Sequence, residues 1–184
     1  LARFAVARGH VRANRFAVET DAGLRTVELL AGADVRAAMG SVTTQPPRTV
    51  RLGGRELRLV PGDAGNPHAV LFVADIATAD VAGIGAGLQA HADFPGGVNV
   101  EFVQVLAPDR LRQRTFERGS GETLACGTGA AVAAIAARAA GLVRGEATIV
   151  ELRGGTLRVV GPAATLAIEG PARTVFTGEI DVPA

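Results

Sequence analysis

The only cysteine of this 184-residue chain, Cys126, directly precedes Gly127, Thr128 and Gly129 and an alanine-rich segment. The segment predicts a helix that begins at the cysteine, so that free backbone amides of the first turn lie beside the sulfur. Such a terminus favours negative charge, and we expect it to lower the thiol pKa and to bind a substrate carboxylate. A dinucleotide-binding fingerprint is excluded, because its third glycine would fall on Val132.

The predicted helix has almost no polar face between Ala130 and Ala137, so other elements must cover it on all sides. A strongly curved sheet around the helix would leave the thiol in a dry, electropositive pocket. That environment suits abstraction of a proton from carbon, because water is excluded and fixed dipoles meet the developing charge. The alternative at this point is that Cys126 is a small buried hydrophobe without chemistry.

Composition narrows the chemistry further. All 19 basic residues are arginine, which excludes a Schiff-base lysine, a phosphate-loop lysine and pyridoxal phosphate held on a lysine of this chain. The formal net charge is +1 and the arginines are scattered, which argues against nucleic acid or an anionic membrane as a partner. With no internal disulfide, signal peptide or membrane-length apolar run, we expect a cytoplasmic protein that binds a small molecule and uses neither a cofactor nor a metal.

The elements that must position Cys126 are mainly strands. Helical patterns cover residues 1–9, with Gly9 as the stop, and also residues 76–91 and 126–140, while residues 43–48 read as a proline-containing connector. Alternating or β-branched runs predict strands at residues 15–20, 24–30, 35–39, 48–52, 56–60, 69–73, 98–106, 110–117, 147–152, 156–160, 165–169 and 174–180. This is an α/β or α+β mixture with few helices.

An internal repeat relates the segment from Ala5 to the segment from Ala137. Both contain a helix tail, a glycine stop, a Val-Arg pair and a hairpin, and the match of Gly9 to Gly141 gives an offset of 132 residues. The match requires a one-residue slip at the hairpin turn, where Leu24 meets Leu157. Chance similarity between two hairpins rich in alanine, valine and arginine is the alternative.

The residues around Cys126 resemble the second active-site motif of the diaminopimelate epimerases. The strings ERG at 117–119, GET at 121–123 and ACGTG at 125–129 stand in that family's order and spacing. The strings MG at 39–40, GNPH at 65–68, FP at 94–95 and NV at 99–100 also agree, so the resemblance covers nearly the whole chain.

The resemblance implies a cofactor-independent isomerase that interconverts LL- and meso-2,6-diaminopimelate in lysine and peptidoglycan precursor biosynthesis. One cysteine thiolate removes the α-hydrogen and a second cysteine thiol delivers a proton to the other face. The implied α/β (α+β) fold has two pseudo-symmetric domains, each a mixed sheet curled around a central helix, with one cysteine from each. Cys126 matches the second cysteine, and the family's first, in a CGNG motif, has no match in this sequence.

The family's other site residues carry over by motif. Gly127 and Thr128 would bind the α-carboxylate, the four residues Asn66, Asn99, Glu117 and Arg118 would bind the charged groups of the substrate, and His68 and Glu117 would tune the proton affinity of the cysteines. Taken singly, most have an ordinary structural explanation: a loop histidine, a turn asparagine or a solvated ion pair. Asn99 is different, because an asparagine within a strand needs a hydrogen-bond partner.

By the same resemblance, residues 40–171 form the C-terminal epimerase domain, and residues 1–39 are a remnant of the N-terminal domain completed by a returning strand at 172–184. The repeat offset places the counterpart of Cys126 seven residues before Leu1, so we expect the chain alone to be inactive. The alternatives are a proline racemase-like or phenazine-biosynthesis-like isomerase of the same fold, or a non-catalytic truncated product. The expected partner is a small-molecule substrate, and a homodimer is left open.

Overall fold

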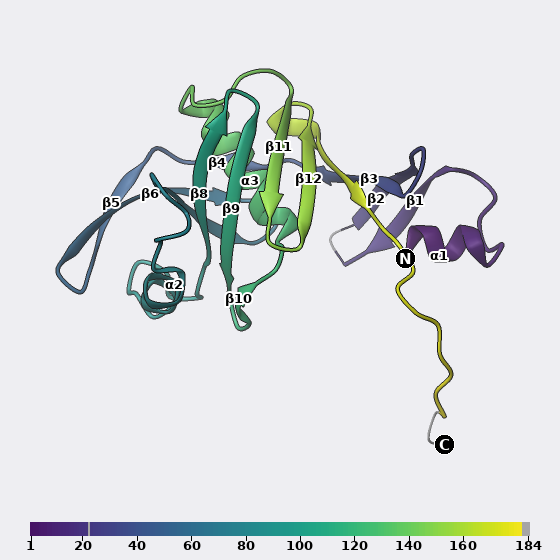
Figure 1. Ribbon diagram of the computed structural model, residues 1–184, viewed down its shortest axis with the longest axis horizontal. Helices are drawn as coiled ribbons and strands as arrows, with labels where there is room; N and C mark the ends of the chain where they lie inside the picture. The colour runs from purple at the N-terminus through teal and green to yellow at the C-terminus, as the bar shows by residue number, and fades with distance from the viewer. Residues whose placement is uncertain (22, 182–184) are drawn as a thin grey trace.

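The computed structural model describes residues 1–21 and 23–181 and consists mainly of strands around one central helix (Figure 1). Its helices are α1 (Ala2–Ala7), α2 (Val81–Gln89), α3 (Gly127–Ala139) and the 3-10 helix η1 (Ala163–Thr165). Its strands are β1 (Arg15–Thr20), β2 (Gly23–Leu29), β3 (Asp34–Gly40), β4 (Thr43–Thr44), β5 (Arg48–Leu52), β6 (Arg55–Asp63), β7 (Pro67–Phe72), β8 (Asn99–Ala107), β9 (Arg110–Glu117), β10 (Gly121–Thr123), β11 (Ala147–Leu152), β12 (Gly155–Val160) and β13 (Leu166–Pro171). Within the described ranges, no helix is long and apolar enough to cross a bilayer.

The strands form one curled, mixed sheet, which confirms the predicted α+β class. Their order is β1-β2-β3-β13-β12-β11-β9-β8-β7-β6-β4, with β5 paired to β6 and β10 paired to β9. The pairs β7–β8 and β9–β11 are parallel, whereas the other pairs are antiparallel. The larger part of the sheet wraps around α3, and β1, β2, β3 and α1 form a smaller lobe joined to it through β3 and β13 (Figure 1).

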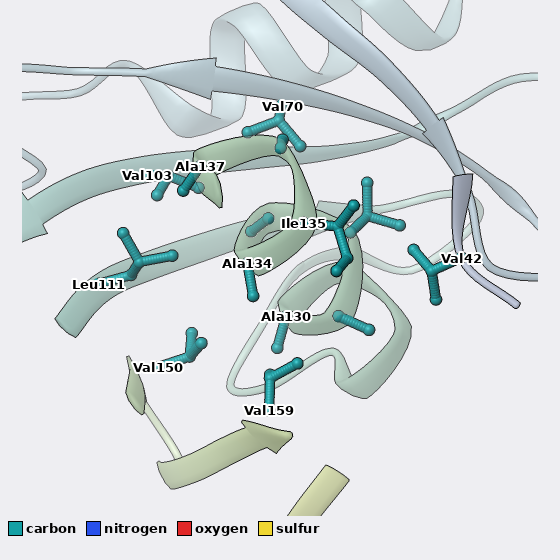
Figure 2. Close-up of a cluster of buried hydrophobic side chains, with 14 of the residues drawn as sticks. Val42, Val70, Val103, Leu111, Ala130, Ala134, Ile135, Ala137, Val150 and Val159 are labelled. Carbon is teal, nitrogen blue, oxygen red and sulfur yellow. The ribbon is translucent and has the colours of Figure 1, made fainter. Parts of the chain in front are cut away.

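Helix α3 is the centre of the main core, as its apolar sequence predicted. Every residue from Ala130 to Ala137 is at most 8% exposed. Figure 2 shows valine and leucine side chains of the surrounding strands directed at the helix, among them Val70, Val103 and Val159. Because most residues of the helix are alanine, strands can approach it closely on several sides.

Helix α2 and strand β5 cover a second apolar cluster on the other side of β7 and β8. The helix was predicted over residues 76–91, but it begins only at Val81. The difference has a local cause. The Asp75 carboxylate accepts the amide of Ala77 at 2.9 Å, and the Asp80 carboxylate accepts the amide of Gly83 at 3.0 Å. These aspartates satisfy amides outside a helix, so that Asp80 becomes the N-cap.

The predicted internal repeat is present in the structure. The glycine after each helix has a left-handed backbone, with φ of 74° at Gly9 and 69° at Gly141. In both copies the next amide donates to the carbonyl five positions earlier at 2.9 Å. The hairpins also agree, because β1–β2 closes at Thr20 and Gly23 while β11–β12 closes at Leu152 and Gly155. The offset that relates Gly9 to Gly141 therefore also relates the two hairpin turns. The slip predicted at the turn is wrong.

Strands β3 and β13 join the two copies about a local two-fold axis. Val27 pairs with Ala37, and its counterpart Val159 pairs with Ile168, so Ala37 and Ile168 occupy equivalent positions. The offset in residue number between Ala37 and Ile168 is one residue smaller than the offset between the two hairpins. The slip therefore lies between the second and third strands of each copy. Ala37 and Ile168 also pair with each other in the antiparallel contact of β3 with β13. A pairing between equivalent positions is the contact that two-fold symmetry produces.

The strand predicted at residues 174–180 is wrong. After the amide of Ala172 donates to the carbonyl of Ala33 at 2.9 Å, residues 173–181 have no regular secondary structure. Val175 and Phe176 are 91% and 84% exposed. The alternating pattern forms a strand only where a neighbouring strand supplies hydrogen bonds, and within the described ranges none lies beside this segment. The returning strand assigned to 172–184 is thus absent over 172–181, and 182–184 lie outside the described residues.

Hydrogen bonds to one carboxylate connect the two copies across their junction, and replacing this carboxylate tests how much it stabilises the junction. Glu169 on β13 bonds Arg36 on β3 and Arg158 on β12, at 2.7 and 2.8 Å. Burial tends to raise the pKa of Glu169, but the hydrogen bonds and charges of both arginines lower it more, so the folded pKa is depressed. Glu169→Gln should lower the free energy of unfolding by about 1–2 kcal/mol at neutral pH.

Because the folded pKa is depressed, this stabilisation is present above the ordinary carboxyl pKa of about 4.3 and is lost as the pH falls through the folded value. Urea unfolding at neutral and acidic pH should therefore show that the difference between wild type and Glu169→Gln shrinks in acid. Glu56→Gln is the control, since Glu56 is 61% exposed in its pair with Arg51. Equal effects of the two substitutions would contradict a structural role of Glu169 at the junction.

Candidate active site

The predicted helix start at Cys126 is confirmed. Cys126 is the N-cap of α3, with extended backbone angles of φ −134° and ψ 111°. Its Sγ accepts a hydrogen bond from the amide of Gly129 at 3.3 Å and lies 3.3 Å from Oγ1 of Thr128. The residue is 6% exposed. The sulfur thus takes the capping place that a serine or aspartate oxygen usually occupies, at the positive end of the helix.

The expected lowering of the thiol pKa is wrong for this chain. Burial, the largest influence, raises the pKa of Cys126. The Thr128 hydroxyl and the Gly129 amide act in the opposite direction, and the negative charges of Glu101 and Glu117 raise the pKa further. The helix terminus is therefore outweighed by desolvation and by two carboxylates, and the thiol holds its proton at neutral pH.

A second group of site residues gathers where β8 begins and β9 ends. Asn99 is 4% exposed, and its Oδ1 accepts the backbone amide of Arg118 at 2.8 Å. This is the partner that a buried strand asparagine was expected to need. Glu117 accepts a hydrogen bond from the Thr123 hydroxyl at 2.5 Å, across the short β9–β10 hairpin. Gly119, with a φ of 80°, allows the tight turn between these strands.

A third group lies on β7 and β8 and contains a residue that the sequence analysis missed. His68 is 1% exposed, with Nδ1 at 2.9 Å from Oε1 of Glu101 and Nε2 at 3.0 Å from Oδ1 of Asn66. Glu101 is fully buried, and burial raises its pKa. A signal was available in the sequence, because a glutamate between Val100 and Phe102 at the centre of an apolar strand requires a buried partner.

Glu101 also contacts the start of α3. A Cβ placed on Gly129 would lie 2.4 Å from Oε1 of Glu101, so no larger residue fits there without movement of the carboxylate. The structure thus brings the histidine group and the cysteine together through Glu101. His68 itself hydrogen-bonds Asn66 and Glu101, whereas the carboxylates that influence the Cys126 pKa are Glu101 and Glu117.

The first turn of α3 lies next to the pseudo-two-fold axis. A Cβ on Gly127 would be 3.2 Å from Cδ1 of Ile168, the residue at the centre of the β3–β13 pairing. Gly127 and Thr128 are half-buried rather than enclosed. Among the larger hollows of the described part of the molecule, one of about 520 Å³ lies at the opposite end of the helix, beside Ala139 and Ala140. The cysteine end faces the junction of the two copies.

Solved structures with this fold are racemases, epimerases and related proteins. A probable proline racemase from Agrobacterium radiobacter superposes with a TM-score of 0.71 at 18% identity, over 97% of this chain and 65% of that protein. A phenazine biosynthesis protein of the PhzF family from Enterococcus faecalis superposes with a TM-score of 0.69 at 17% identity, over 98% of this chain and 70% of that one. The fold is therefore the curled-sheet fold that these two proteins share.

Sequence similarity identifies the family within this fold. The family model described as diaminopimelate epimerase matches residues 62–177. The diaminopimelate epimerase of Alkalilimnicola ehrlichii is 41% identical over 196 aligned positions, which cover 98% of this chain and 70% of that protein. The chain belongs to the diaminopimelate epimerase family, a family of isomerases.

The contact between Gly129 and Glu101 can be tested by substitution. Gly129→Ala should push the buried carboxylate away from the helix start and lower the free energy of unfolding by about 1–3 kcal/mol. It should also loosen the first turn, so that Cys126 becomes less buried and reacts several-fold faster with iodoacetamide. Gly96→Ala is the matched control, since a Cβ there meets no atom within 4 Å. Unchanged stability and thiol reactivity in Gly129→Ala would show that the contact is not tight.

Proposed function

We propose that this chain supplies one of the two bases of a diaminopimelate epimerase, and that Cys126 is that base. The observation that carries the proposal is the position of the thiol, which caps α3 beside Ile168 at the pseudo-two-fold axis. A symmetry-related helix start would face the same space from the other copy. Two thiols on opposite sides of one carbon atom are the arrangement that inversion of that centre requires.

In the proposed reaction one thiolate removes the α-proton of the amino acid, and the electron pair remains on the α-carbon beside its carboxylate. The thiol on the other side then gives its proton to the opposite face of the α-carbon, which inverts the configuration. The first sulfur ends the reaction as a thiol and the second as a thiolate. The amides of Gly127 and Thr128 would hold the α-carboxylate at the start of α3, where the helix dipole favours negative charge.

The remaining charged groups of the substrate would contact the two neighbouring groups of polar residues. Asn66, Asn99 and Arg118 can donate hydrogen bonds to a carboxylate, whereas Glu117 can accept from an ammonium group. The hydroxyl of Thr123 holds the Glu117 side chain by a hydrogen bond, and the backbone amide of Arg118 holds the Asn99 side chain in the same way. These contacts favour a substrate with both carboxylate and ammonium groups away from the reacting centre, as in 2,6-diaminopimelate.

The repeat supports the domain assignment proposed from sequence. Residues 40–171 would form the domain that carries Cys126, and residues 1–39 would belong to the other domain. At the repeat offset of Gly9 to Gly141, α1 corresponds to the last turns of α3, and the counterpart of Cys126 falls outside the 184 residues. In this proposal the second base lies outside the 184 residues.

Two other functions are less well supported. Proline racemase-like or phenazine-biosynthesis-like chemistry fits the fold, but the identity to those proteins is below 20%, against 41% to a diaminopimelate epimerase. A non-catalytic product would fit the single cysteine, and it predicts no activity in any longer form of the chain. We further propose a cytoplasmic location and leave a homodimer as an open possibility for the complete enzyme.

The proposal predicts two activities. The 184-residue chain should not epimerise LL-2,6-diaminopimelate, because it has one thiol and that thiol is protonated at neutral pH. Expressed from the whole reading frame that contains it, the protein should epimerise the substrate, and Cys126→Ala should lower kcat/KM by at least about 10³-fold. Activity is measured by chiral separation of the isomers together with exchange of the α-hydrogen in deuterated water.

Thr148→Val, a buried polar substitution remote from the start of α3, is the control for folding effects. Turnover by the 184-residue chain would contradict the two-base proposal. So would turnover by Cys126→Ala in the longer protein, or a complete reading frame that encodes no second cysteine.

A further inference from the structure

His68 and Glu101 form a buried pair whose protonation is restricted by its surroundings. Both side chains are 0% exposed, and Nδ1 of His68 is 2.9 Å from Oε1 of Glu101. Within the described residues, Oε2 of Glu101 is buried and has no hydrogen-bond partner. An ionised carboxylate there would keep a full charge in a dry site with one oxygen unsolvated, which costs several kcal/mol in typical proteins.

The state of this pair determines which way the amide of Asn66 faces. If the pair carries no net charge and its shared proton lies between Nδ1 and Oε1, Nε2 of His68 holds a hydrogen and donates it to Oδ1 of Asn66, at 3.0 Å. The other neutral form, with the carboxyl hydrogen on Oε2, is disfavoured because Oε2 has no partner among the described residues. If the pair is an anion, Nε2 is a bare acceptor, and Asn66 must turn its NH₂ group toward the histidine. The protonation state of the His68–Glu101 pair therefore acts on Asn66 through two consecutive hydrogen bonds. It decides whether Asn66 presents its carbonyl oxygen or its NH₂ group to the site.

We infer that Glu101 is a positioning residue, which keeps a proton in the pair it forms with His68 so that Asn66 turns its NH₂ group toward the substrate. Glu101 itself touches no substrate. The inference rests on the proposed function only for the identity of that substrate. The orientation of Asn66 follows from the buried pair alone.

Asn99 shows the same arrangement on the next strand. Its Oδ1 accepts the backbone amide of Arg118, an N–H group that can only donate, so its NH₂ group is the free end. His68 and Asn99 are register partners in the parallel pairing of β7 with β8. Asn66 and Asn99 would thus present two amide donors at one edge of the sheet. Two donors select a group that only accepts hydrogen bonds, which is a carboxylate rather than an ammonium.

The charged groups around Glu101 come from three elements. His68 on β7 is its hydrogen-bonding partner, Glu117 at the end of β9 raises its pKa by charge, and Cys126 lies at the start of α3. Its cross-strand neighbour on β9, Thr115, is buried and neutral. Ionisation of Glu101 would therefore add a second negative charge next to Glu117 and further disfavour a thiolate at Cys126.

The test is nitrogen-15 NMR of the imidazole rings, which distinguishes a protonated from a bare ring nitrogen. It uses the 184-residue chain, in which His68 is one of three histidines and is assigned by loss of its signals in His68→Gln. At neutral pH we expect a hydrogen on Nε2 of His68. Glu101→Gln should keep this state, because its amide still donates to Nδ1.

Glu101→Met removes the donor and should weaken the preference for Nε2–H, so that the Nδ1–H tautomer also appears, whereas Thr115→Val on the neighbouring strand should not have this effect. A bare Nε2 in the wild type, or an unchanged tautomer in Glu101→Met, would overturn the inference. If Glu101→Met does not fold, the wild type and Glu101→Gln still decide it. The measurement involves no epimerisation, so a failure of the proposed function would leave its outcome unaffected.

Discussion

Burial of an apolar helix on all sides is the constraint on which the rest of the structure depends. Helix α3 has no polar face, so the sheet must curl around it, and the polar residues of that sheet can reach only the two ends of the helix. Strands β7 and β8 are parallel and begin at the cysteine end, and β9 is antiparallel to β8 and ends there. The topology therefore places His68, Asn99 and Glu117 at the same end of α3 as Cys126, although they are far apart in the sequence.

The pseudo-two-fold axis adds a second constraint. Because Ala37 and Ile168 are equivalent and pair with each other, the two copies meet along one antiparallel contact. The first turn of α3 lies beside Ile168, so Cys126 is placed next to the axis. In the proposed two-base site, this position would let the buried thiol face its counterpart from the other copy. The repeat thus fits the two-sided chemistry proposed for one carbon atom.

Most of the fold could be predicted from the sequence, because alternating strands, glycine stops and an all-apolar helix are local patterns. Two errors came from contacts that such patterns do not contain. The α2 boundary depends on Asp75 and Asp80 capping nearby amides, and the strand at 174–180 lacks a neighbour. The positions of the site residues could be inferred only through family motifs, and Glu101 was missed because the matched string at 99–100 ends one residue before it. The direction of the Cys126 pKa required burial, which the helix start alone does not reveal.

The direction of that pKa also restricts how a half-site of this kind can act. Cys126 is buried, and both Glu101 and Glu117 disfavour its thiolate. A substrate carboxylate bound at the α3 amides would add a further negative charge, whereas a substrate ammonium would offset it. In the direction of the proposed reaction in which Cys126 is the proton donor, a base on the other side of the axis takes the α-proton. A His68–Glu101 pair without net charge, as inferred above, would remove the contribution of Glu101, so that Glu117 would be the one carboxylate charge opposing a thiolate at Cys126.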